Sequence, residues 1–354
     1  MLRYYKFSIL FTLLCLALAA WYGWNQTGTV AGTLALLWIV VVLSVLEISL
    51  SFDNAVVNAT VLEEMDAVWQ RRFLTWGMLI AVFGMRIFFP LAIVAIAAGL
   101  NPAETVRLSL NDPVRYEEIV SSAHVGIAGF GGAFLTMVGL KFFFDADKDV
   151  HWIAVVEEQL AKFSRIQAVE IGFLLVVLYM VSLMLPEQEA LTFLVAGMLG
   201  IVTFIAVEAI GTILELREEA RDLTGAVVRS GLGGFLYLNV LDASFSFDGV
   251  IGAFALSNNM VVIALGLSIG AMFVRSMTIM LVQKGTLAEY RFLEHGAFWA
   301  IIALGAIMLL SARYHIPETI TGLIGAALIG ISLWWSVRHN RRHPNVKPPA
   351  LESD

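Results

Sequence analysis

Long apolar stretches alternate with short polar loops along almost the whole chain. A membrane-spanning helix needs roughly 20 consecutive apolar residues, and ten stretches reach or approach that length. Several are long enough to be tilted or interrupted, and the second and seventh carry acidic residues in their interior. The pattern therefore predicts about ten spanning helices, at residues 7–24, 31–61, 73–99, 122–144, 168–185, 191–214, 230–256, 260–283, 296–312 and 317–336.

Composition agrees with this interpretation. Of the 354 residues, 59% are hydrophobic and 14% are charged, whereas soluble domains are about 45–50% apolar and about 25% charged. We expect an all-α polytopic membrane protein with a single transmembrane domain over residues 1–336 and a disordered cytoplasmic tail over 337–354. The first apolar run can also be read as a signal peptide with a cleavage site at Ala17–Ala19, but it continues to Trp24, which favours a retained span.

The distribution of Lys and Arg predicts the orientation. With the N-terminus inside, most basic residues fall in cytoplasmic loops and only Arg107, Arg115 and Arg313 fall on the opposite side, as the positive-inside rule requires. Both termini are then cytoplasmic, in a bacterial inner membrane.

No basic patch with interleaved aromatic residues supports nucleic-acid binding, and the single cysteine, Cys15, excludes a disulfide framework and a Cys-based zinc site. The expected partners are the lipid bilayer and an ion, and the oligomeric state stays open.

One polar pattern occurs twice inside apolar stretches. The first motif, Glu-Ile-Ser-Leu-Ser-Phe-Asp-Asn, runs from Glu47 to Asn54, and the second motif, Asp-Ala-Ser-Phe-Ser-Phe-Asp-Gly, runs from Asp242 to Gly249. They lie in the second and seventh predicted spans, and an odd offset of five inverts one half relative to the other. We therefore expect two inverted repeats, about 7–186 and 191–336, an architecture typical of transporters. A count of eight or nine spans would change this parity.

Two further pairs of segments extend the duplication. The Gly77–Arg86 segment aligns with Gly266–Arg275, with Gly, Ile and Arg coinciding. His124 and His295 each open the span that follows. Because the pairs occur in the same order in both halves, they indicate an internal duplication.

The acids of the two motifs indicate a cation site. Placing a carboxylate at membrane depth costs roughly 2.5–3.5 kcal/mol on insertion scales. Four carboxylates in two copies of one motif therefore indicate a function that offsets this cost. Carboxylate, hydroxyl and amide oxygens suit Mn²⁺, Mg²⁺ or Ca²⁺, whereas Cu(I) and Zn²⁺ prefer sulfur and imidazole. The candidate metal ligands are Glu47, Asp53, Asn54, Asp242 and Asp248.

Helical spacing places Ser51 on the face of Glu47, and Ser246 on the face of Asp242. The two acids of one motif do not share a face, so a local unwinding is needed for them to converge, and Gly249 and Gly252 favour unwinding in the second motif.

The remaining candidates have supporting roles. Arg86 and Arg275 can act around the ligands or in gating, or they can form buried ion pairs with the acids that only fix helix packing. His124 and His295 can be proton carriers or accessory ligands, or they can be polar caps at the ends of spans.

The paired motifs resemble the two signatures of the TerC family of bacterial integral membrane proteins. The similarity lies in Glu47-x-x-Leu-Ser-Phe-Asp53-Asn, in Asp242-x-x-Phe-Ser-Phe-Asp248 and in the Gly-and-Arg helices that follow each. This resemblance implies membership of the LysE-type transporter superfamily, a role in manganese efflux, and the four acids as metal ligands with Asn54 beside them. The chain departs from the family pattern in the long segments 100–121 and 145–167 and in its extra apolar spans, which indicates a separate branch.

The leading hypothesis is a divalent-cation transporter, with Mn²⁺ efflux as its activity and with no enzymatic function or prosthetic group. One rival is a non-transporting metal-binding partner that serves metal homeostasis. A second rival is an intramembrane aspartyl hydrolase with two facing acids, against which the four acids and the flanking serines argue.

Overall fold

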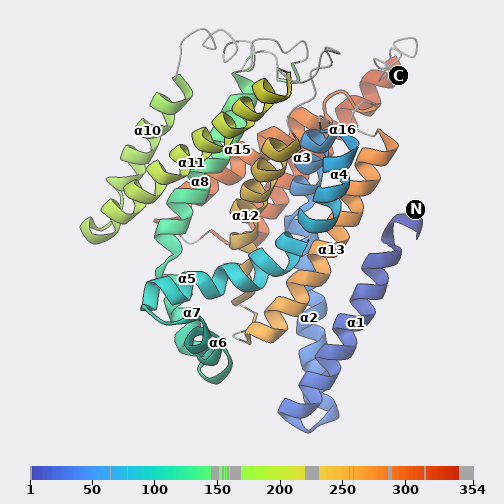
Figure 1. The fold of residues 1–354 in the computed structure, drawn as a ribbon, viewed down its shortest axis with the longest axis vertical. Coiled ribbons are helices and arrows are strands. Elements are labelled where there is room, and N and C mark those ends of the chain that lie inside the picture. Colours follow the sequence, from blue (N-terminus) through green and yellow to red (C-terminus); the bar gives the residue numbers. More distant parts are fainter. Residues whose placement is uncertain are drawn as a thin grey trace.

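The structure is a computed structural model, and every long element in its described part is a helix (Figure 1). It describes residues 2–144 except 64 and 78, residues 151–153, 155, 157 and 159, residues 169–219, residues 231–285 except 255 and 258, and residues 289–342 except 315. The helices, with η for π-helical turns, are α1 (Leu2–Thr27), α2 (Val30–Leu50), α3 (Phe52–Glu63), α4 (Ala67–Arg72), η1 (Phe73–Gly77), η2 (Ile80–Phe88), α5 (Phe89–Ala98), α6 (Pro102–Asn111), α7 (Pro113–Ser122), α8 (His124–Phe143), α10 (Val169–Ser182), α11 (Glu187–Glu219), α12 (Gly231–Phe254), α13 (Met260–Lys284), α15 (Leu293–Ser311) and α16 (Glu318–Arg342).

Helical structure lies in each of the ten predicted ranges, and within the described part seven helices are long and apolar enough to cross a membrane. Three of the predicted ranges contain no helix of this kind among their described residues. Residues 73–99 are divided among η1, η2 and α5, the fifth range holds only the short helix α10, and α12 carries the polar second motif. Helix α16 continues to Arg342, and the rest of the predicted tail lies outside the described residues. Among the described residues, the seven candidate spanning segments are 3–27, 30–50, 124–143, 187–213, 260–284, 293–311 and 320–342.

Buried apolar side chains form two hydrophobic clusters, and both motifs lie where one cluster meets the other. The first cluster is built around α8, α11 and α15 and includes Leu62 of α3 and Leu241 of α12. The second is built around α1, α2 and α13 and includes Leu43 of α2 and Val250 of α12. The chain therefore passes from one apolar core to the other at each motif, where polar side chains interrupt the apolar packing.

The two halves are interleaved. Helices α2 and α3 pack against α13 and α15 of the second half, while α12 packs against η2 and α8 of the first half. Helix α8 also packs against α15. Figure 1 shows α2 and α13 running side by side, with α1 beside them and with α8, α10 and α11 on the opposite flank. In the first motif, both α2 and α3 thus contact the arginine-bearing helix α13, and α3 contacts the histidine-bearing helix α15. In the second motif, α12 contacts η2, which carries Arg86, and α8, which carries His124.

The third apolar stretch changes its winding and direction. It begins in the π-helical turns η1 and η2, whose backbone hydrogen bonds span one residue more than those of an α-helix, and continues as α5. In Figure 1, α5 runs at a steep angle to α13 and leads to the short pair α6 and α7. π-helical turns are frequent at functional sites, and η2 carries Arg86.

Candidate metal centre

The helix of the first motif is interrupted at Ser51. Helix α2 ends at Leu50 and α3 begins at Phe52, while Ser51 has φ −103° and ψ 19°, outside the helical region. The Ser51 hydroxyl donates to Oε1 of Glu47 at 3.0 Å, a local side-chain bond of the kind that competes with regular helix. The interruption leaves Glu47 in the last turn of α2 and Asp53 in the first turn of α3, where the helix dipole favours a negative charge.

The second motif is not interrupted, which corrects the prediction of unwinding at Gly249 and Gly252. Helix α12 continues from Gly231 to Phe254. Gly249 has a different role, because a Cβ atom on it would lie 2.8 Å from Oε2 of Glu47. The absence of a side chain at Gly249 makes room for the carboxylate of the first motif.

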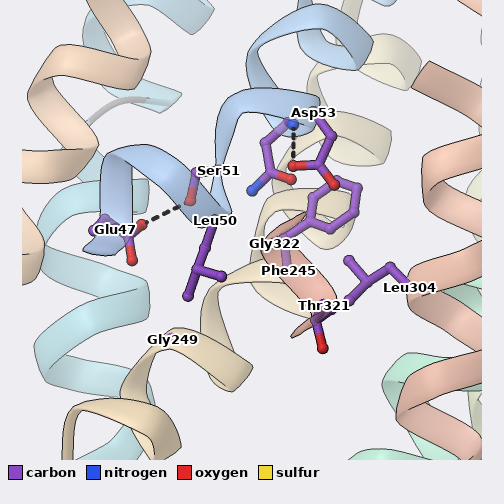
Figure 2. Close-up of a pocket in the computed structure, with 10 residues that line it drawn as sticks. Glu47, Leu50, Ser51, Asp53, Phe245, Gly249, Leu304, Thr321 and Gly322 are labelled. Carbon is purple, nitrogen blue, oxygen red and sulfur yellow. Dashed lines mark hydrogen bonds between the residues drawn. The ribbon is translucent and has the colours of Figure 1, made fainter. Parts of the chain in front are cut away.

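The first motif and Gly249 line a cavity of about 30 Å³ (Figure 2). A water molecule needs roughly 10–15 Å³ of such space, so the cavity admits a species the size of a water or a bare ion. Figure 2 shows Glu47 and Asp53 on opposite sides of Leu50, with the Thr321 hydroxyl turned away from Asp53. The lining residues are Glu47, Leu50, Ser51, Asp53, Asn54, Phe245, Gly249, Leu304, Thr321 and Gly322.

Glu47 is buried against three helices and paired with an arginine. Its side chain is 2% exposed and forms an ion pair with Arg86 of η2, whose residue is 4% exposed. On the side of α13, a Cβ on Gly270 would lie 2.4 Å from Cβ of Glu47, so that helix packs directly on the stem of the glutamate. The ion-pair alternative is therefore realised for Glu47 and Arg86, at the edge of the cavity.

Two buried amide oxygens have no hydrogen-bond donor among the described residues. They are Oδ1 of Asn54, which lines the cavity, and Oδ1 of Asn58, one turn further along α3. Both residues are about 95% buried, with exposures of 4% and 5%. Buried polar atoms are nearly always satisfied in folded proteins, so an unsatisfied carbonyl oxygen in the cavity wall indicates a site that accepts an additional positive or donating group.

The second motif approaches the first through Asp242. Nδ2 of Asn58 lies 3.5 Å from Oδ1 of Asp242, and the charges of Glu47 and Arg86 both act on Asp242. The side chains of Ser246 and Asp248 lie outside the described part of the structure, although their backbone belongs to α12. Arg275 lies on α13 and is partly buried.

The two candidate histidines lie in separate places, and neither lines the cavity. His124 opens α8, and its Nε2 lies 3.1 Å from the carbonyl oxygen of Ser311 at the end of α15. His295 is buried, with its Nε2 3.6 Å from Oε2 of Glu157, whose other oxygen accepts from the Trp299 indole at 3.0 Å. These contacts hold the start of α8 against the end of α15, and place His295 of α15 beside Glu157.

Within the described residues, no group of three or more His, Cys, Asp and Glu side chains is placed to hold a metal ion. The described donor set at the cavity is smaller and contains only oxygen. It consists of the Glu47 and Asp53 carboxylates and the Asn54 amide oxygen, with the Ser51 hydroxyl committed to Glu47. Such a set can bind a hard cation, provided that the cation competes with Arg86 for Glu47.

Helix α16 contributes cavity residues that motif reasoning missed. Thr321 and Gly322 line the cavity, and a Cβ on Gly325 would lie 3.4 Å from Oδ2 of Asp53. The only sequence signal was the pair of glycines on one side of the last apolar stretch, since small residues allow membrane helices to approach closely.

The comparisons with known proteins give one match. The family model described as "Protein of unknown function (DUF475)" matches residues 52–343. The chain belongs to this family. The matched region includes Asp53, Arg86 and the whole second motif, and Glu47 lies just before it. No curated protein and no solved structure matches the chain.

Proposed function

We propose that this member of the family is a divalent-cation transporter of the bacterial inner membrane, with Mn²⁺ efflux as its activity. The cation binds in the cavity at the interruption between α2 and α3, held by Glu47, Asp53 and the amide oxygen of Asn54. The observation that carries the proposal is a small cavity lined by two buried carboxylates and by a buried asparagine whose carbonyl oxygen is unsatisfied.

The size of the cavity selects the class of substrate. Pockets for organic ligands are about 300–1,000 Å³, whereas this one is about 30 Å³. A single dehydrated ion fits that space. Hard divalent cations take oxygen ligands of the types present here, and the two carboxylates balance a divalent ion once Arg86 no longer pairs with Glu47.

The interleaved packing supports alternating access between two halves. The pairings of α2 and α3 with α13 and α15 repeat those of α12 with η2 and α8, as expected if the halves are related by duplication. An interrupted helix near an ion site is a recurrent feature of transporters built from inverted repeats. We propose ten spans with both termini inside, so that Asp242 and Asp248 of α12 approach the same site from the other half.

The choice of Mn²⁺ rests on the resemblance of both motifs to TerC signatures. Mg²⁺ and Ca²⁺ fit the same donor types, so the panel of ions in the experiment decides among them. The non-transporting and hydrolytic rivals gain no support from a specific feature of the described residues.

The test is divalent-ion flux into proteoliposomes that contain the purified full chain. We expect saturable Mn²⁺ flux in the parent protein and its loss in Asp53→Asn and Asp248→Asn. Glu187→Gln, which changes an exposed acid in the first turn of α11, is the matched control and should transport normally. Size-exclusion profiles show whether each variant is folded.

Three outcomes would contradict the proposal. Absence of flux for Mn²⁺, Mg²⁺ and Ca²⁺ in the folded parent would exclude divalent-cation transport. Binding of Mn²⁺ without flux would favour the non-transporting metal partner. Unchanged flux in folded Asp53→Asn would move the site away from the cavity.

A further inference from the structure

We propose that Arg86 is a built-in counter-cation, which occupies Glu47 between transport events and competes with the transported ion for that carboxylate. This inference rests on the proposed function and adds a mechanism of release to it. The Arg86 guanidinium neutralises the Glu47 carboxylate after the ion leaves, and an arriving ion displaces the guanidinium from that carboxylate.

The burial of the pair makes competition unavoidable. Glu47 and Arg86 are 2% and 4% exposed, so water screens their charges little. The arginine guanidinium stays charged at every physiological pH. A divalent cation that approaches Glu47 therefore meets a permanent positive charge on the same carboxylate, and it binds fully only if that charge moves away.

The arrangement of the Glu47 oxygens lets both cations reach the same group. Oε1 contacts Arg86 and accepts the Ser51 hydroxyl. Oε2 faces the space left by Gly249, in the wall of the cavity. Glu47 thus lies between Arg86 and the cavity, and a cation in the cavity and the guanidinium approach the carboxylate from two sides.

Arg86 also connects the site to the second half. Its charge acts on Asp242 of α12, which is weakly held by Asn58 at 3.5 Å. Movement from Glu47 towards Asp242 would free the first motif without leaving the guanidinium unpaired in an apolar region. The π-helical winding of η2 offers a route for that movement, because a change from π to α winding rotates a side chain around the helix axis.

The main alternative to the counter-cation role is a structural one, in which Arg86 only holds η2 against α2. Removal of a structural arginine would weaken the fold and with it the site, so the apparent affinity for the ion would fall. Removal of a competing counter-cation has the opposite effect on affinity. The sign of the change in KM therefore separates the two roles.

The experiment measures Mn²⁺ flux kinetics in proteoliposomes for the parent, Arg86→Gln and Arg86→Lys. We expect Arg86→Gln to lower KM by roughly tenfold, the low end of what a unit charge a few ångströms away exerts, and to lower kcat because release becomes slow. Arg86→Lys keeps the charge with a single, more mobile ammonium and should give intermediate values. Lys141→Gln breaks the exposed pair with Glu208 outside the cavity and should leave both constants unchanged.

An unchanged or raised KM in folded Arg86→Gln would overturn the counter-cation role while parental flux still supports the proposed function. If Arg86→Gln does not fold, Arg86→Lys decides, and an unchanged KM in that variant rejects the inference. If the folded parent carries no divalent cation, the proposed function fails and the counter-cation role fails with it.

Discussion

The two motifs have nearly the same sequence but different backbones. The first motif is broken at Ser51 into α2 and α3, whereas the second lies in the uninterrupted helix α12. In the first motif the serine hydroxyl is bonded to a carboxylate. That serine is Ser51, and the side chain of its match in the second motif, Ser246, lies outside the described residues. The other pair of serines agrees, since Ser49 and Ser244 each donate to the backbone carbonyl oxygen four residues earlier, at 2.8 Å and 3.1 Å.

This difference shows that a duplicated sequence pattern need not give two equivalent sites. The first motif supplies most of the described polar lining of the cavity, and the second supplies a packing surface, Phe245 and Gly249, against which the first motif's carboxylate rests. A helix interruption exposes backbone and rearranges side chains only where neighbouring helices satisfy the freed groups. The asymmetry between the motifs therefore involves their neighbours as well as their own residues, such as the Ser51 hydroxyl bonded to Glu47.

The largest expected effect comes from filling the space beside Glu47. In Gly249→Ala the added Cβ would lie 2.8 Å from Oε2 of Glu47, the far end of a flexible side chain, so the carboxylate moves while the fold is retained. We expect Mn²⁺ flux to fall about 10–100-fold, as for other changes that reorient a metal ligand, with little change in thermal stability. Flux assays and melting curves of the purified variants measure both.

The companion variant Gly270→Ala reaches the other end of the same glutamate. Its Cβ would lie 2.4 Å from Cβ of Glu47 and 3.0 Å from the carbonyl oxygen of Ser44, so α13 and α2 must separate. We expect a stability loss of about 1–3 kcal/mol from overpacking, seen as a lower melting temperature. Equal stability in the two alanine variants would contradict the distinction between a movable carboxylate and a fixed helix contact.

The positions of the elements were largely readable from the sequence. Apolar length predicted helical structure in all ten ranges, because side chains in contact with lipid or with an apolar core must be apolar over a whole span. The i to i+4 spacing also placed Ser51 beside Glu47, and the structure has that contact at 3.0 Å. Local periodicity carries this information because it depends only on the geometry of one helix.

The site was less readable, since it depends on contacts between distant segments. Gly249 suggested unwinding, but its small size serves a carboxylate from the other half. Thr321 and Gly322 belong to no motif and line the cavity because α16 packs beside the break. The matched histidines of the two halves have unlike neighbours, the Ser311 carbonyl and the Glu157 carboxylate, so equivalent sequence positions gave different surroundings.

A smaller effect should separate two serines that make different hydrogen bonds, Ser51 of the first motif and Ser244 of the second. Ser51→Ala removes a hydroxyl that donates to a buried carboxylate, and hydrogen bonds to charged groups contribute about 1.5–3 kcal/mol. Ser244→Ala removes a bond to a neutral backbone carbonyl of the same helix, for which about 0.5–1.5 kcal/mol is typical. We expect Ser51→Ala to lower both the melting temperature and Mn²⁺ affinity more than Ser244→Ala does. A larger effect of Ser244→Ala would contradict the ranking of a bond to a buried carboxylate above a bond to a neutral backbone carbonyl.

The smallest effect concerns the far end of the first motif's helix. Helix α3 ends in Glu63, and burial, assisted by the charge of Glu294, raises the pKa of the Glu63 carboxyl to about 7. An acid whose pKa is higher in the folded than in the unfolded state stabilises the fold below its unfolded pKa, and this contribution is lost as the pH rises through about 7. Helix α12 ends at Phe254 without an acid, so the second motif's helix contributes no such dependence at its end.

We expect the parent's melting temperature to decline modestly from about pH 4.5 to pH 7, because Glu63 is only half buried and water screens its charge. Glu63→Gln should flatten that decline, and Glu187→Gln should preserve it. If the melting temperature changed equally with pH in all three proteins, Glu63 would not be the source of the pH dependence.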